Sequence, residues 1–326
     1  MARERIGIAI LGAGGIAGAH LQALNTLPEG RLVATCDLDA ARARARAEEF
    51  GAEHFFTTWE ETLACPGVDA VIVCLPNALH RDAVVEAARA GKHVLVEKPM
   101  ATTLADASAM VEAAEAAGVT LMVGQVLRFY AANRLARQFL REGRIGRPRN
   151  LLRRRLGVFH DWVAWAKDPA LCGGITLYGF GSHEVDMMLW LTDSRATRVY
   201  AEGEQIHPVW RDYDDVSLQM RLANGCMAAL QLSTNCAETV WDCLVIGDEG
   251  TLAVGSDWVS VNGERTAAPI GPAGGMTAQL AEFLAAINEG REPEASGRQV
   301  RDTTMAALEA ARRSLASHAV EAVTLE

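Results

Sequence analysis

The segment that decides the fold lies near the start of the chain and reads IGIAILGAGGIAG over residues 6–18. Its apolar first half, residues 6–11, is typical of a strand that is buried on both faces of a parallel sheet. A glycine-rich turn over 12–18 follows, and residues 19–27 have helical character. We therefore predict a strand, a tight turn and a helix, which together form the first unit of a doubly wound α/β sheet.

The turn carries a spacing with a specific physical meaning, Gly12-x-Gly14-x-x-Ala17. Gly12 permits a tight turn, Gly14 lets the backbone approach a pyrophosphate, and the small Ala17 lets the helix pack closely on the strand. The N-terminus of that helix would face the phosphate groups. The pattern indicates a dinucleotide-binding turn, and the alternative is a glycine-rich turn in an unrelated α/β protein.

Asp37 follows the next strand-like segment, 32–36, and favours the dinucleotide interpretation. A carboxylate at this place can accept hydrogen bonds from both ribose hydroxyls. It favours NAD, because the 2′-phosphate of NADP would meet a like charge. Arg42 lies close by in the sequence and could accommodate that phosphate, so NADP remains open.

The pattern along the chain divides it into two parts. Strand-like and helix-like segments alternate up to residue 124, which predicts a Rossmann-type, doubly wound parallel sheet over 1–124. Residues 125–326 predict an α+β domain with an open, mainly antiparallel sheet, since their strand-like segments alternate polar and apolar residues. Those segments are 150–158, 197–206, 216–222, 226–234, 241–247 and 251–254, and one strongly apolar helix is expected over 181–191.

Composition excludes several classes of protein. The chain has 326 residues and a formal net charge of −10, which argues against a nucleic-acid partner. It has no apolar stretch of the length that a membrane span needs, and its N-terminus lacks the layout of a signal peptide. Its 7 cysteines are scattered without a CxxC pair, which favours reduced thiols in a cytoplasmic protein and no metal site.

Lysine is rare, because only Lys92, Lys98 and Lys167 contribute to the 31 basic residues. Ligands of open parallel sheets bind beyond the carboxyl ends of the strands. Lys98 follows the strand-like segment 94–96, whereas Lys92 precedes it and is expected to be structural. The Lys98 amine could donate to an oxygen whose charge changes during hydride transfer, with a surface lysine as the alternative. Glu97 could hydrogen-bond the nearby backbone or a cofactor.

A second candidate segment reads GGITLYGFGSHEVD over residues 173–186. Its glycines suggest a chain that threads closely past a ligand before helix 181–191 begins. His183 lies in the first turn of that helix and could exchange a proton with a substrate hydroxyl. Asp186, three residues further on, could orient the imidazole. The alternative is a structural histidine.

Taken together, these motifs resemble the Gfo/Idh/MocA oxidoreductase family over nearly the full chain. The resemblance rests on the glycine fingerprint, Asp37, Leu75-Pro76-Asn77-x-x-His80, the segment AGKHVLVEKP over 90–99, and Gly181-x-His183-x-x-Asp186. The Glu-Lys-Pro and Gly-x-His pair is much more specific than the fingerprint alone.

The resemblance implies an enzyme that transfers a hydride between NAD(P) and a sugar, cyclitol or related hydroxy compound. It implies that Lys98 and His183 are catalytic. It also implies a second domain that binds substrate and forms homodimers or homotetramers through its sheet. Carried over by position, the cofactor site comprises Gly12, Gly14, Ala17, Asp37, Pro76, Asn77, His80, Glu97 and Gln125.

One position departs from the family pattern. Dehydrogenases of the family carry an aspartate four residues before the histidine, and this chain has Gly179 there. Asp161 and Asp168 are candidates to replace that carboxylate. The departure keeps two alternatives open: an NAD-retaining lyase, hydrolase or isomerase that works through transient oxidation, and a non-catalytic dinucleotide-binding paralogue. Substrate specificity is expected from the loop that carries Phe159, His160, Trp162 and Trp165.

Overall fold

The computed structural model describes residues 5–160, 163–269 and 274–325, which form two compact units. Unit 1 comprises the described residues up to Ala101, Ala105–Val126 and the stretch that ends at Arg298. Unit 2 comprises Thr102–Leu104, the described residues between Leu127 and Pro272, and those from Gln299 onward.

Unit 1 contains the parallel sheet that the sequence predicts. Its strand order is β3-β2-β1-β4-β5-β6, which is the order of a Rossmann fold, and every pair is parallel. β1 and β4 are buried along their full length. The strands are β1 (Ile6–Leu11), β2 (Gly30–Cys36), β3 (His54–Phe56), β4 (Ala70–Val73), β5 (His93–Val96) and β6 (Leu121–Val123). The prediction of a doubly wound sheet is confirmed, although β3 is only three residues long and largely exposed.

Helices connect these strands, and α2 shows how local sequence sets the ends of a helix. α2 begins after Asp39, whose carboxylate accepts from the backbone N–H groups of Ala41 and Arg42, and it ends at Gly51 in the left-handed conformation. The helices of this part are α1 (Gly15–Leu24), α2 (Ala40–Phe50), α3 (Trp59–Ala64), α4 (His80–Arg89), α5 (Leu104–Ala117) and α9 (Gly274–Glu289).

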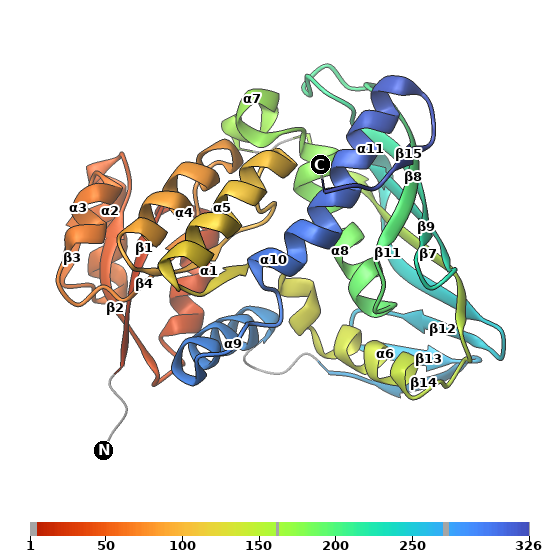
Figure 1. The fold of residues 1–326 in the computed structure, drawn as a ribbon, viewed down its shortest axis with the longest axis horizontal. Coiled ribbons are helices and arrows are strands. Elements are labelled where there is room, and N and C mark those ends of the chain that lie inside the picture. Colours follow the sequence, from red (N-terminus) through yellow and green to blue (C-terminus); the bar gives the residue numbers. More distant parts are fainter. Residues whose placement is uncertain (1–4, 161–162, 270–273, 326) are drawn as a thin grey trace. The chain divides into compact units, whose positions relative to one another are not determined.

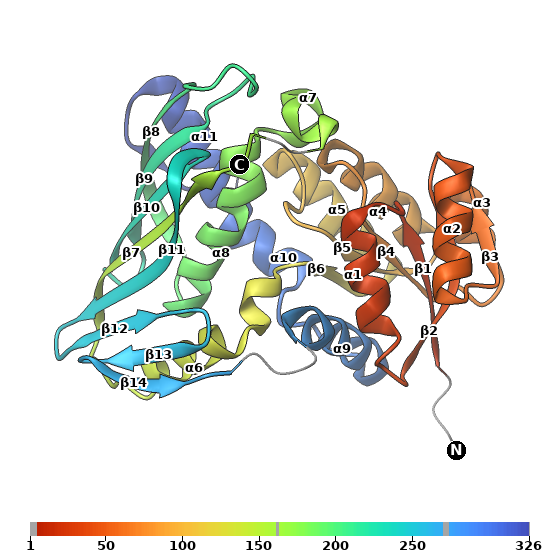
Figure 2. The same ribbon diagram turned by 180° about the vertical axis from the view of Figure 1, so that it is seen from behind.

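α9 belongs to unit 1, although the sequence analysis places all of 125–326 in the second domain. Figure 2 shows α9 beside α1, with which it is in contact. A Cβ atom built on Gly30 would lie 3.3 Å from a methyl group of Leu284, which places α9 against the sheet. The segment after α9 continues on this unit, because the N–H of Val123 donates to the carbonyl of Ala295 over 2.9 Å. Apolar contact with the sheet therefore determines the unit to which α9 belongs, and chain order does not.

Unit 2 is built on a nine-stranded sheet with the order β14-β13-β12-β11-β7-β10-β9-β8-β15. Every neighbouring pair is antiparallel except β7 and β10, so the predicted open, mainly antiparallel sheet is confirmed. The strands are β7 (Pro148–Val158), β8 (Ala196–Glu204), β9 (Asp215–Leu222), β10 (Met227–Ser233), β11 (Asn235–Gly247), β12 (Thr251–Val254), β13 (Trp258–Val261), β14 (Glu264–Ala267) and β15 (Glu321–Ala322).

Helices cover one face of this sheet. α8 (Gly181–Leu191) and α11 (Ala306–Ser317) lie on the same face in Figure 1. The alternation along β9 agrees, because Leu218 and Met220 are buried while Ser217 and Gln219 are exposed. The remaining helices are α6 (Ala131–Arg141), the single turn α7 (Pro169–Cys172) and α10 (Gly297–Val300). None of the helices in the described ranges is long and apolar enough to cross a membrane.

Candidate functional site

The turn after β1 has the geometry that its glycines predict. Gly12 has a φ of +93°, and a Cβ atom there would lie 2.4 Å from the carbonyl oxygen of Cys74. Around Gly14 and Gly15, in contrast, a Cβ atom would meet nothing within 4 Å. Gly14 caps α1 without a side-chain hydrogen bond, so the first N–H groups of the helix face open space. Ala17 is fully buried between helix and sheet.

Asp37 joins this turn to the end of β2. Its Oδ2 accepts from the N–H of Ala13 over 2.9 Å, and its Oδ1 accepts from the N–H of Asp39 over 2.9 Å. The guanidinium of Arg42 lies 3.2 Å from Oδ1. Arg42 therefore already has a carboxylate partner in the structure.

His80 hydrogen-bonds to the backbone that follows two neighbouring strands, β4 and β5. Its Nδ1 lies 2.9 Å from the carbonyl oxygen of Pro99, and its Nε2 lies 3.0 Å from that of Leu75. Burial lowers the pKa of the His80 imidazole. Pro76 and the buried Asn77 begin the short 3₁₀ turn, 77–79, that leads into α4. Both ring nitrogens of His80 thus contact the backbone that leads to Asn77 and follows Lys98.

Glu97 is buried and holds the backbone of Lys98 in place. Its Oε1 lies 2.7 Å from Nε2 of His20 on α1, and its Oε2 accepts from the N–H of Lys98 over 3.2 Å. Burial would raise the pKa of Glu97, but the hydrogen bond and charge of His20 together with Lys98 outweigh it, and the pKa lies below its ordinary value. Sequence reasoning missed His20, because an isolated histidine on an apolar helix gives no local signal of its partner.

Gln125 follows β6 and is only 1% exposed. Within the described residues its side-chain oxygen and nitrogen have no hydrogen-bond partner. A buried amide without partners is costly, so this side chain is suited to a polar ligand. The residues described so far follow five adjacent strands, β2, β1, β4, β5 and β6, at their carboxyl ends. This is the edge at which open parallel sheets bind ligands.

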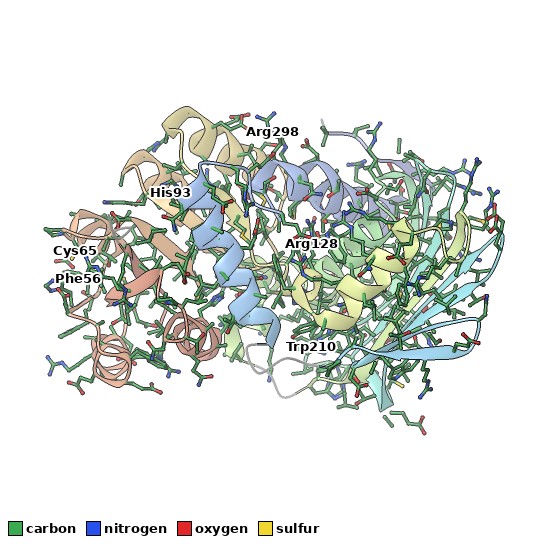
Figure 3. The ribbon with its side chains drawn as sticks, turned by 90° about the horizontal axis from the view of Figure 1, so that it is seen from below. Phe56, Cys65, His93, Arg128, Trp210 and Arg298 are labelled. Carbon is green, nitrogen blue, oxygen red and sulfur yellow. The ribbon has the colours of Figure 1, made fainter. Side chains whose placement is uncertain are left out.

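The opposite edge of unit 1 carries a separate cavity of about 310 Å³. His93 and Arg298, both labelled in Figure 3, line it. Nδ1 of His93 accepts from the N–H of Thr120 over 3.0 Å, and burial lowers the pKa of His93. This cavity lies at the amino ends of β5 and β6, away from the predicted site.

In unit 2, the segment before His183 is helical. Residues Ile175–Phe180 form a π-helical turn that runs directly into α8. Gly174 has a φ of +101°, and a Cβ atom there would lie 2.3 Å from Oδ2 of Asp212. The close carboxylate and the left-handed backbone explain the glycine. Tyr178 is buried, and its hydroxyl donates to Glu309 over 3.2 Å.

Asp186 forms a buried ion pair, which sequence spacing does not reveal. Nε and Nη2 of Arg128 donate to its two oxygens over 2.7 and 2.6 Å, and Thr304 Oγ1 donates to Oδ1 over 2.9 Å. Arg128, labelled in Figure 3, also donates to Gln299 over 2.8 Å. We therefore assign Asp186 to anchoring α8, in place of the predicted role of orienting His183.

A second buried carboxylate on α8 is Glu184, the neighbour of His183 in the sequence. It accepts from Nε of Arg153, from Nη1 of Arg155 over 3.2 Å and from the indole N–H of Trp241 over 3.4 Å. The half-buried His183 therefore lies on a helical turn that is anchored on two sides by charged groups.

The aspartates that could replace a carboxylate at position 179 differ in their surroundings. A Cβ atom on Gly179 would lie 2.6 Å from Cδ1 of Ile175 on the preceding turn. Asp161 and Trp162 lie outside the described residues. Asp168 caps α7 by accepting from the N–H of Ala170 over 3.1 Å. Asp212, which sequence reasoning did not single out, is half-buried, and burial raises its pKa.

The two lysines beside β5 differ in their surroundings. Nζ of Lys92 donates to the carbonyl of Val68 over 2.8 Å, which confirms its structural role. Lys98 is half-buried just past the end of β5. In the ranges that the structure describes, no group of three or more His, Cys, Asp or Glu side chains could hold a metal ion.

Comparison with known proteins gives matches over most of the chain. A family model described as "Oxidoreductase family, NAD-binding Rossmann fold" matches residues 6–125, and one described as "GFO/IDH/MocA C-terminal domain" matches 133–253. The chain is 30% identical to 4-carboxy-2-hydroxymuconate-6-semialdehyde dehydrogenase of a Sphingobium species, over 90% of this chain and 94% of that protein.

Two further proteins are similar to this chain over most of its length. A 1,5-anhydro-D-fructose reductase of Ensifer adhaerens is 33% identical over 82% of this chain and 84% of its own. The crystal structure of an aldose-aldose oxidoreductase of Caulobacter crescentus, complexed with glycerol, superimposes with a TM-score of 0.90 at 27% identity. That superposition covers 98% of this chain and 100% of the other.

The Arg128–Asp186 pair yields a stability prediction. Arg128→Met would leave a buried carboxylate without its cation, and we expect it to cost about 3–5 kcal/mol in the free energy of unfolding. Urea titration measures this loss. The double variant Arg128→Met/Asp186→Leu should recover a large part of it.

Arg141→Met is the matched control, because Arg141 pairs with the exposed Asp193 on the surface. It should cost about 0.5 kcal/mol or less. Equal losses for Arg128→Met and Arg141→Met would show that the buried pair does not anchor α8.

Proposed function

This chain belongs to the GFO/IDH/MocA oxidoreductase family, and we propose that it transfers a hydride between NAD and a sugar, cyclitol or related hydroxy compound. The family membership agrees with the resemblance that the sequence motifs indicate. The observation that carries the proposal is the set of residues at the carboxyl edge of the unit 1 sheet. There a glycine turn follows β1, a carboxylate follows β2, and β6 is followed by a buried amide that has no hydrogen-bond partner among the described residues.

These residues fit a dinucleotide. The open space around Gly14 and the uncapped N-terminus of α1 suit a pyrophosphate, with Gly12 and Ala17 shaping the turn. The Asp37 carboxylate suits the ribose hydroxyls and disfavours a 2′-phosphate. Since Arg42 already pairs with Asp37, we propose NAD in preference to NADP.

The other residues of the proposed cofactor site divide into two groups. Pro76, Asn77 and Gln125 follow β4 and β6 and are proposed to contact the dinucleotide. Glu97 and His80 are engaged by other protein groups, so we propose that they hold the turn around Lys98 in position. When bound, NAD supplies the nicotinamide carbon that accepts or returns the hydride.

Lys98 and His183 are the proposed catalytic residues. The Lys98 ammonium would donate a hydrogen bond to the substrate oxygen and stabilise the charge that develops on it. The His183 imidazole would accept the hydroxyl proton during oxidation and return it during reduction. The buried carboxylates on α8 would keep the His183 turn in place.

The uncovered face of the unit 2 sheet supports a proposal for assembly. Large apolar side chains, Leu152, Met227 and Ile246, are exposed on neighbouring strands of this face. We propose that a second copy covers it and that the chain forms homodimers or homotetramers.

Sedimentation velocity tests the assembly. The wild-type chain should sediment as a dimer or tetramer, and Met227→Glu should shift it to smaller species by burying a charge in the interface. Val320→Glu, at an exposed apolar position outside the patch, is the control. A monomeric wild-type chain would overturn this part of the proposal.

Lys98→Met tests the chemistry. Removal of the amine should lower kcat by roughly 10²–10⁴-fold on the best substrate of a panel of sugars and cyclitols, while NAD affinity stays within about threefold. Formation of NADH is the readout. Lys92→Met, at the other end of β5, should retain normal turnover. A change of less than about twofold for Lys98→Met would disprove its catalytic role, and turnover without net NADH would favour the lyase, hydrolase or isomerase alternative.

Asp37→Asn tests the cofactor preference. The loss of charge should lower kcat/KM for NAD by about 10- to 100-fold and should bring the values for NAD and NADP closer together. Asn can still accept from the N–H of Ala13. Asp39→Asn is the control, since asparagine caps a helix as well as aspartate does. An unchanged ratio of the two kcat/KM values for Asp37→Asn would contradict the assignment.

A further inference from the structure

Two arginines of β7 lie on the face of the unit 2 sheet that α8 covers. Side chains alternate along a strand, so Arg153 and Arg155 share one face and Arg154 takes the other. The contacts agree: Arg153 and Arg155 both donate to Glu184 on α8, whereas Arg154 is exposed and pairs with Asp242.

The charges in this cluster do not balance. Arg153 is 5% exposed, and burial opposes its charge, but interactions with Glu184 and Cys243 keep the pKa of Arg153 above its ordinary value. Burial raises the pKa of the adjacent Cys243, which keeps its thiol neutral. Among the described residues, Glu184 is the only carboxylate paired with either arginine. Two cations therefore share one anion, and a largely buried positive charge without a counter-ion is unfavourable.

Arg155 carries the excess charge in a form that can bind a ligand. A guanidinium has five N–H donors, and within the described residues Arg155 uses only Nη1, toward Glu184. Its Nε is fully buried without a partner. Aromatic rings surround the group, with the Phe180, Trp241 and Phe159 centroids 4.8, 5.1 and 5.9 Å from its central carbon. Such walls exclude water and strengthen an interaction with an anion.

This guanidinium also lies against the helical turn that carries His183. Phe180 and Glu184, which contact Arg155, stand three residues before and one residue after His183. Residues three and four apart are neighbours on a helix. Phe159, on the other side, begins the loop from which substrate specificity is expected.

We propose that Arg155 is an anion-binding subsite that receives a carboxylate group of the substrate, so that the preferred substrates are hydroxy acids such as sugar acids. The proposal rests on the proposed function and narrows its substrate class. One unbalanced positive charge matches one carboxylate, and the planar fork of a guanidinium matches its two oxygens. A phosphate dianion would leave a negative charge unpaired in the same cluster.

Matched pairs of compounds test this in the wild-type chain saturated with NAD. D-glucuronate and D-glucose differ by a carboxylate at one carbon, as do D-glycerate and glycerol. Calorimetric titration should show at least about tenfold tighter binding of the acid than of its neutral partner in one of the pairs or more. Absence of a preference for the acid in every pair would overturn the proposal without any variant.

Variants of the strand then locate the subsite. Arg155→Gln should weaken binding of the preferred acid by about 10- to 100-fold and change binding of the neutral compound by less than about threefold, while Arg155→Lys should give an intermediate loss. Arg154→Gln removes a charge from the adjacent, exposed position and should change neither. Equal weakening of acid and neutral compound by Arg155→Gln would indicate a structural role and overturn the proposal.

The same measurements separate this proposal from the proposed function. If neutral compounds are oxidised with formation of NADH but acids have no advantage, only the Arg155 subsite fails. If the chain binds no NAD and forms no NADH with any compound, the oxidoreductase proposal itself fails.

Discussion

The close approach of β1 and β4 at Gly12 is the constraint on which the rest of unit 1 depends. With a carbonyl oxygen 2.4 Å from the place of a Cβ atom, any side chain at this position would push the two strands apart. The approach aims the backbone of Gly14 and the N-terminus of α1 at open space. It also brings Ala13 within hydrogen-bond distance of Asp37, so the turn and the carboxylate form one rigid arrangement.

In unit 2, α8 packs against the sheet although its first turn consists of glycine and polar residues. Apolar packing alone would leave the first turn of α8 weakly specified. Glu184 and Asp186 instead bind arginines that come from β7 and from the segment before α6. Buried charged pairs of this kind contribute little net stability, but separating the two partners is costly because each would be left as a buried charge without a counter-ion. The ion pairs of Glu184 and Asp186 therefore hold the His183 turn in place without taking part in the proposed chemistry.

Local sequence predicts unit 1 well because its determinants are local. An apolar run, a glycine turn and a helix lie within 22 residues of one another, and further strand-like and helix-like segments then alternate. The features that sequence missed all depend on distant partners. Arg128 and Asp186 stand 58 residues apart, and His20 and Glu97 stand 77 apart. α9 returns to the first sheet late in the chain, and no local signal tells which of two sheets an apolar helix will cover.

The segment before His183 shows most clearly what local sequence does not predict. Its glycines suggest a chain that passes close to a ligand, and the segment forms a π-helical turn in which Gly173 and Gly174 have left-handed conformations and which α8 continues. The glycines were rightly singled out, but the conformation follows from the neighbouring Asp212 and from the packing of Tyr178, which the sequence does not place.

Direct transfer of a hydride is the central claim, and isotopic labelling tests it. The wild-type chain would be given NADH with deuterium at both positions of the reactive nicotinamide carbon, together with the carbonyl form of its best substrate. We expect one deuterium on the carbon that becomes the alcohol, as detected by mass spectrometry of the product. Formation of an alcohol that carries no deuterium would contradict direct hydride transfer.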